Sequence, residues 1–118
     1  ANMNIILNTD KIFDYINQAT VCIGAPGVSH LERLYLGLPT ILIAQNRNQK
    51  NIIDNWVKMN CALKAECSVR SILDNVKILL NNDELRSLFK KNGQHLVDGK
   101  GAKRIAKKIN LFENSRII

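Results

Sequence analysis

The sequence lacks any long hydrophobic run, and no stretch approaches the roughly 20 consecutive apolar residues that a membrane-spanning helix requires. It also lacks an opening of charged, apolar and small residues of signal-peptide type. These absences predict a cytoplasmic protein with no membrane span. The 118 residues can bury a real core, so we expect a single domain over residues 1–118.

Metal-ligating residues are also scarce. The three cysteines are odd in number and have no paired spacing, and only His30 and His95 could help them hold a metal. Reduced, mostly buried thiols are the expected state. The sequence predicts no metal site, and nothing in it indicates a cofactor.

The charge is not balanced along the chain. Of the net charge of +7, most belongs to residues 83–118, which hold nine Lys and Arg against four acids. There the cations alternate with apolar residues at helical spacing, which is typical of the solvated outer face of a packed helix. We therefore expect no nucleic-acid partner. The cations concerned are Lys100, Lys103, Arg104, Lys107 and Lys108.

Short runs of Ile, Val and Leu alternate with longer segments of helical period. This alternation is typical of parallel strands joined by crossover helices. It predicts a Rossmann-like, three-layer α/β sandwich with a short parallel sheet and C-terminal helices. The expected strands are Asn4–Leu7, Thr20–Ile23, Thr40–Ala44 and Cys61–Ala65.

Several helix boundaries can be predicted from local signals. After a first helix with Ile12, Phe13, Ile16 and Ala19 on one face, we expect a helix from about Ser29 to Leu36 that Gly37 ends. Ser68 can cap a later helix, and Asn82 or Asp83 the one after it.

In an open parallel sheet, ligands lie beyond the carboxyl ends of the strands. This rule selects three polar loops, at residues 8–11, 24–29 and 45–49. Each loop directly follows an expected strand.

The loop after the second strand is the most informative. Gly24 and Gly27 allow a ligand to approach the main chain, and the amides of Val28 and Ser29 would be free donors at a helix start. Phosphate fits this arrangement. The alternative is a plain turn in which "SHLE" forms a capping box, with Ser29 as N-cap and Glu32 reaching back to it.

Two nucleotide-binding classes are excluded by missing motifs. "GAPGVS" is not a G-x-G-x-x-G fingerprint, and no G-K-S or G-K-T occurs in the chain. Ser29 and His30 are adjacent on a helix start and do not face one another, so they do not begin a hydrolytic triad.

The ordered set "IGAPGVSHLERLYLGLP", followed by a strand and by "NQ" at a helix start, resembles the carboxyl-terminal nucleotide-binding half of glycosyltransferase-B-fold proteins. Within that fold it is most similar to the UDP-sugar hydrolases of pseudaminic acid biosynthesis, and less so to the N-acetylglucosaminyltransferase that makes lipid II. The resemblance covers about residues 4–60. It implies one half of a glycosyltransferase-B fold, excised from a longer two-domain protein.

The resemblance also implies roles for particular residues. Glu32 matches the acid that holds the two ribose hydroxyls of UDP, a task that suits a carboxylate because it accepts two hydrogen bonds at once. The residues that match the diphosphate-binding turn are Gly27, Val28 and Ser29. The matches to the uracil loop are Asn8, Thr9, Asp10 and Lys11, and the matches to the amides that contact sugar or phosphate are Asn48 and Gln49.

The sequence departs from the family pattern at two positions. Pro26 stands where the family usually has glycine, which removes one amide donor. His30 replaces a small or hydroxylated residue and could lie near the phosphates or the sugar, although a lone histidine at a helix start is more often structural.

The function implied is that of the UDP-sugar-binding half of a hydrolase that releases UDP by water attack. The catalytic base would lie in the missing N-terminal domain, so no catalytic residue is expected here, and the partners would be the UDP-sugar and that domain. One alternative is the donor-binding domain of a UDP-N-acetylglucosamine-type glycosyltransferase. An alternative of another class is a non-enzymatic binding module.

Overall fold

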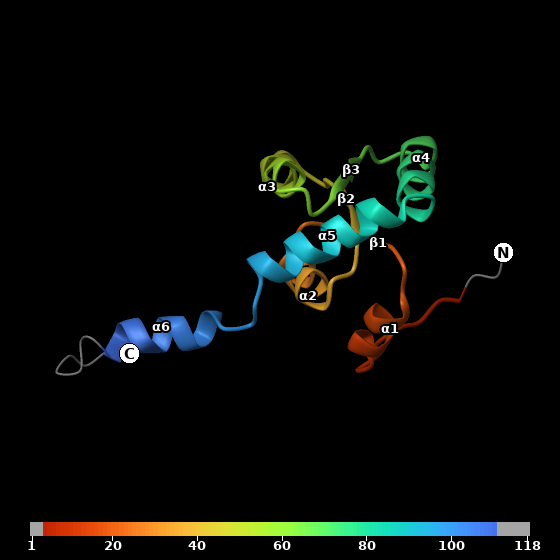
Figure 1. The fold of residues 1–118 in the computed structure, drawn as a ribbon. Helices are drawn as coiled ribbons and strands as arrows, with labels where there is room; N and C mark the ends of the chain where they lie inside the picture. The colour runs from red at the N-terminus through yellow and green to blue at the C-terminus, as the bar shows by residue number, and fades with distance from the viewer. Residues whose placement is uncertain (1–3, 111–118) are drawn as a thin grey trace.

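The computed structural model describes residues 4–110, in which short strands alternate with longer helices (Figure 1). The three strands form one parallel sheet in the order β1-β2-β3. This is a parallel α/β arrangement of the Rossmann-like kind, which confirms that part of the prediction. In chain order the elements are α1 (Ile12–Gln18), β1 (Cys22–Gly24), α2 (Val28–Leu36), β2 (Thr40–Ile43), α3 (Arg47–Lys58), β3 (Leu63–Ala65), α4 (Val69–Leu80), α5 (Asp83–Leu96) and α6 (Gly101–Asn110).

The central strand β2 is buried on both of its faces. Ile41 packs in one cluster with Leu79 of α4 and Phe89 of α5. Leu42 packs in a second cluster with Ile53 of α3. Because successive side chains of a strand point to opposite faces, helices cover the sheet on both sides. This explains why the strand reads as a continuous apolar run.

Local sequence signals end and begin the helices as predicted. Gly37 stops α2 in the left-handed conformation, with φ of 75°, which glycine adopts at little cost. The Ser68 side chain accepts a hydrogen bond from the amide of Ser71 at 3.2 Å and caps α4. Asn82 caps α5 in the same way, from the amide of Leu85 at 3.0 Å.

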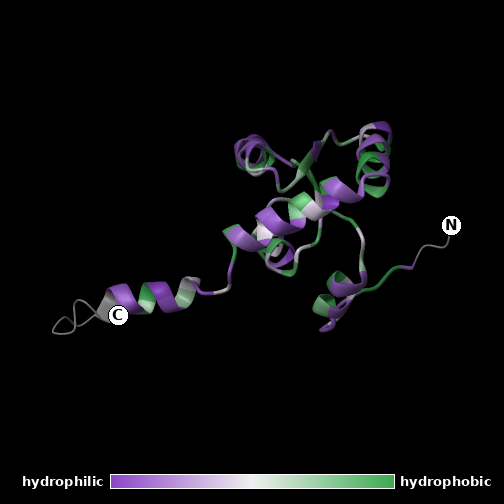
Figure 2. Ribbon diagram, viewed as in Figure 1, coloured by the Kyte–Doolittle hydropathy of each residue, from purple (hydrophilic) through white to green (hydrophobic). Residues whose placement is uncertain are grey.

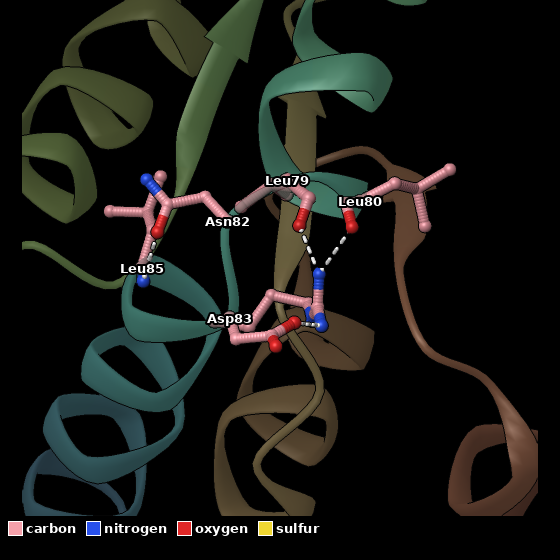
Figure 3. Close-up of polar contacts among 6 residues, drawn as sticks. Leu79, Leu80, Asn82, Asp83 and Leu85 are labelled. Carbon is pink, nitrogen blue, oxygen red and sulfur yellow. Dashed lines mark hydrogen bonds and ion pairs between the residues drawn. The ribbon is translucent and has the colours of Figure 1, made fainter.

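Arg86 connects the two helices at the corner between α4 and α5, where Figure 3 labels its partners Leu79, Leu80 and Asp83. The Arg86 guanidinium donates to the carbonyl oxygens of Leu79 and Leu80 at 2.6 and 2.7 Å, and it also pairs with the Asp83 carboxylate. These carbonyls belong to the last turn of α4, where the helix ends before an amide four residues further on can donate to them. Arg86 therefore connects the end of α4 to the start of α5, the helix that carries Phe89 into the core.

The predicted strand Asn4–Leu7 is wrong, because this segment is not a strand in the structure. Ile5 is 80% exposed and Leu7 79% exposed. Figure 2 shows this hydrophobic segment leading to α1 without lying against the sheet. The composition gives the segment strand propensity, but a strand also needs a partner, and within residues 4–110 the strand β1 pairs with β2 alone. Residues 8–11 therefore do not follow a strand.

The first predicted helix forms as α1, but its apolar face is not buried. Ile12 and Phe13 are 47% and 50% exposed, and Ile16 is half-buried. The segment before α1 does not join the sheet, so it offers no buried apolar surface against which α1 could pack.

The basic C-terminal helix α6 also forms, but the expected packing is wrong. Every described side chain from residue 101 to 108 is exposed, and α6 extends away from the sheet (Figure 1). The start of α6 is held locally, since Asp98 accepts from the amide of Lys100 at 3.0 Å and pairs with Arg104. The helix therefore presents its apolar stripe, with Ile105 62% exposed, to solvent.

No helix within residues 4–110 is long and apolar enough to cross a membrane. Among the same residues no three His, Cys, Asp or Glu side chains gather closely enough to hold a metal ion.

Candidate functional site

The candidate site lies at the carboxyl edge of the sheet. β1, β2 and β3 run parallel, so their carboxyl ends and the starts of α2, α3 and α4 meet at the same edge. Three loops are brought together there, at residues 25–27, 44–46 and 66–68. The second and third predicted loops therefore share one side of the molecule.

The first turn of α2 is the barest of the three helix starts. Gly27 is its N-cap, at φ of −106° and ψ of −161°, and no side chain within residues 4–108 caps this turn. The amides of Val28 and Ser29 have no acceptor within the helix, because the first amides of a helix lack one. Val28 is 77% exposed and Ser29 is exposed. The capping box of the alternative interpretation is absent, since α2 begins one residue before Ser29.

The starts of α3 and α4 differ from that of α2 because polar side chains cap both. In α3 the Asn46 side chain accepts from the amide of Gln49 at 3.0 Å, and the Gln49 side chain accepts from the amide of Gln45 at 2.7 Å. The side-chain oxygen of Gln49 is therefore already engaged in a hydrogen bond within the protein. Asn48 lies exposed in the same first turn. Ser68 caps α4.

Gly24 and Gly27, predicted together as points of ligand approach, have different roles. A Cβ atom on Gly24 would lie 2.7 Å from Nη1 of Arg33, whereas a Cβ on Gly27 would meet nothing within 4 Å. The space beside Gly24 is therefore filled by the protein itself, and that part of the prediction is wrong. Only Gly27 leaves its backbone open to a ligand.

Arg33 lies in this region but is not among the predicted site residues. It lies in α2 and is only 7% exposed, and its Nη2 donates to the carbonyl oxygen of Ala25 at 2.7 Å. Burial lowers the pKa of the guanidinium, while the nearby Cys22 and Glu32 raise it. In the sequence, Gly24 nine residues earlier indicates a position that needs space beside its backbone. Only the folded structure shows that the Arg33 side chain fills that space.

His30 is buried rather than turned toward a ligand. It is 1% exposed, and its ring meets that of Trp56 edge-on, with the centroids 5.2 Å apart. Burial lowers the pKa of His30 to about 4, and the positive charge of Arg33 contributes to the same shift. The imidazole is therefore neutral at physiological pH. This placement favours the structural interpretation of His30.

Glu32 lies half-buried in the second turn of α2, one turn after Val28 and Ser29. Among the described residues its carboxylate makes no hydrogen bond or ion pair with another side chain. Its oxygens are therefore available to hydroxyl donors.

Residues 8–11 form a turn before α1, with Asn8 at a positive φ of 50° and the amide of Lys11 donating to the Thr9 hydroxyl at 3.0 Å. Asp10 is exposed in the same turn. Because the segment before this turn is not in the sheet, sheet pairing does not carry it to the carboxyl edge.

A cavity of about 390 Å³ lies elsewhere, at the amino ends of β1 and β2 and against α5. It is lined by residues that include Thr20, Pro39 and Lys90, none of which belongs to the predicted site. This cavity is therefore separate from the carboxyl edge of the sheet.

Comparison with known proteins adds no family. No protein-family model matches the chain, and no curated protein matches it significantly.

Proposed function

We propose that this chain is the UDP-sugar-binding half of a nucleotide-sugar hydrolase of the kind that serves pseudaminic acid biosynthesis, with the architecture of half a glycosyltransferase-B fold. The observation that carries the proposal is the bare start of α2 at the carboxyl edge, between the open Gly27 and the unpaired Glu32. Unpaired amides and the positive end of a helix dipole favour an anion at such a position.

In this proposal the diphosphate lies on the amides of Val28 and Ser29, and Glu32 accepts hydrogen bonds from the ribose hydroxyls. Asn48 contacts the sugar or phosphate from the start of α3. Gln49 contributes through its side-chain NH2 group, since its side-chain oxygen accepts from the amide of Gln45. Residues 8–11 would recognise uracil if they move to the carboxyl edge.

The chemical contribution of this half is positioning and charge stabilisation. Release of UDP builds negative charge on the departing diphosphate, and donors placed beforehand at that point lower the barrier. The water-activating base would come from the other half, so this chain is expected to bind UDP without turning over a UDP-sugar. A UDP-N-acetylglucosamine-type transferase would use the same half, with an acceptor hydroxyl in place of water.

The test is a calorimetric titration of UDP into wild-type protein and Glu32→Ala. Loss of a charged hydrogen-bond partner predicts binding weakened by about 10- to 150-fold, which corresponds to about 1.5–3 kcal/mol. Glu66→Ala is the matched control, because Glu66 is an exposed acid at the same edge of the sheet. Equal binding by Glu32→Ala and wild type would remove the ribose role.

A second candidate is a non-enzymatic module for an anionic macromolecule. It is favoured by the exposure of every described side chain from residue 101 to 108. This candidate predicts RNA binding that falls steeply with salt, together with no response to UDP. A UDP response without RNA binding would exclude it.

A further inference from the structure

Arg33 is a buried cation with very few partners. It is 7% exposed, and its Nε atom is fully buried without a hydrogen-bond acceptor. Among the described residues, its Nη2 donates to the Ala25 carbonyl oxygen at 2.7 Å, and the guanidinium also lies against the Cys22 thiol. Buried polar groups are nearly always satisfied, so an unsatisfied one calls for a physical explanation.

The side chain is directed toward the start of its own helix. Side chains of a helix tilt toward its N-terminus, and Arg33 stands in the second turn of α2. Its guanidinium reaches back to the loop before the helix, where it fills the space left by Gly24 and bonds to Ala25. The positive charge therefore lies beneath the same loop that ends in the bare N-cap Gly27.

No anionic side chain neutralises this charge. Within residues 4–108 no carboxylate forms an ion pair with Arg33, and the charge of Glu32, its neighbour in the chain, acts on the guanidinium without direct contact. The Cys22 thiol lies against the guanidinium, but burial raises the pKa of this thiol, so it supplies no negative charge. The buried ring of His30 adds two nitrogens without partners. A buried charge that is left unpaired is strongly unfavourable.

We propose that Arg33 is a positioning residue whose missing counter-charge is the diphosphate of the ligand at the start of α2. It holds the Gly24–Ala25 backbone in place and supplies a fixed positive charge beneath the anion. This inference rests on the proposed function and deepens it, because it makes the site selective for the phosphates rather than for the nucleoside. A purely structural arginine would stabilise the loop without that selectivity.

The test compares wild type with Arg33→Gln and Arg33→Lys, using inorganic pyrophosphate, UDP and uridine as probes in calorimetric titrations. Arg33→Gln is expected to weaken pyrophosphate and UDP binding by at least about 10-fold while changing uridine binding little. Arg33→Lys keeps the charge but loses the planar fork, so an intermediate loss is expected. Arg70→Gln removes the same charge from an exposed position at the start of α4, and it should bind like wild type.

A measurement on wild-type protein covers the case in which Arg33→Gln fails to fold. The Nε–H signal of Arg33 is followed by NMR during a pyrophosphate titration, together with the amides of Val28 and Ser29. A shift of the Arg33 signal along with these amides supports the inference. Shifted amides beside an unmoved Arg33 signal, or an Arg33→Gln protein that binds pyrophosphate like wild type, would overturn it and leave the proposed function standing. Unmoved amides would remove both.

Discussion

His30 of α2 is buried as a neutral side chain against Trp56 of α3. Arg33, three residues further along α2, makes a protonated imidazole still less favourable. Both side chains are buried, so α2 has a polar inner side as well as an exposed first turn. The positions of these buried polar side chains are visible only in the folded structure.

His30 gives the protein a predictable pH dependence. The pKa of the folded state, about 4, lies below the ordinary value of 6.5, so the unfolded chain binds more protons between these two values. Stability is therefore full above the unfolded pKa and is lost as the pH falls through this window. Between about pH 7 and about pH 5 we expect the free energy of unfolding to fall by about 2 kcal/mol.

Urea unfolding at several pH values measures this effect. His30→Phe removes the titrating group and keeps a ring against Trp56. The free energy of unfolding of this variant should therefore depend less on pH over the same window. His95→Phe is the control, because His95 is exposed in α5. If the free energy of unfolding depends on pH equally in wild type and His30→Phe, His30 is not the source of the pH dependence.

At the scale of single elements, α2 differs from α3 and α4 in having no side-chain cap. Caps and stops are local, so Gly37, Ser68 and Asn82 could be predicted from the sequence and are confirmed. The packing of Arg33 against Gly24 could not be predicted, because it depends on how α2 returns along β1.

The predicted strand Asn4–Leu7 failed for a related reason. Strand propensity is carried by the segment itself, whereas pairing requires another strand in the right place. The site residues predicted near Gly27 follow from a loop and a helix start that are continuous in the chain, and their ligand roles stay predictions.

The bare N-cap predicts opposite effects on stability and binding. Gly27→Asp supplies a capping carboxylate and favours the helix dipole, so the free energy of unfolding should rise by about 0.5 kcal/mol. The same carboxylate occupies the amides and repels phosphate, so UDP binding should weaken by at least about 10-fold. Thermal unfolding and UDP titration measure the two effects.

Gly27→Ala is the matched control for this experiment. A Cβ at this position meets nothing within 4 Å, and φ of −106° suits any residue, so the amides stay open. The alanine protein should bind UDP within about threefold of wild type. If Gly27→Asp gains stability and binds UDP unchanged, the anion is not held at this turn.

At the scale of the whole molecule, stability is concentrated around the sheet. Leu79 and Ile53 are fully buried on the two faces of the sheet, whereas the described part of α6 contributes no buried side chain. Figure 2 shows that α6, which contains hydrophobic residues, lies away from the sheet and the helices around it. The core and the basic helix are thus energetically separate.

This separation predicts unequal effects of two similar substitutions. Leu79→Ala should lower the free energy of unfolding by about 2–5 kcal/mol, because it leaves a cavity against Ile41 and Phe89. Ile105→Ala should change it by less than about 0.5 kcal/mol, since Ile105 is 62% exposed. Chemical denaturation measures both values. A large loss for Ile105→Ala would show that α6 is packed in solution.

The central claim is that the start of α2 holds the diphosphate of UDP. The most direct measurement is an amide-resolved NMR titration of the wild-type protein with UDP. The account predicts that the largest shifts fall on the amides of Gly27, Val28 and Ser29, with further shifts at Glu32 and Asn48. No shift in this group at millimolar UDP, or shifts confined to α6, would contradict it.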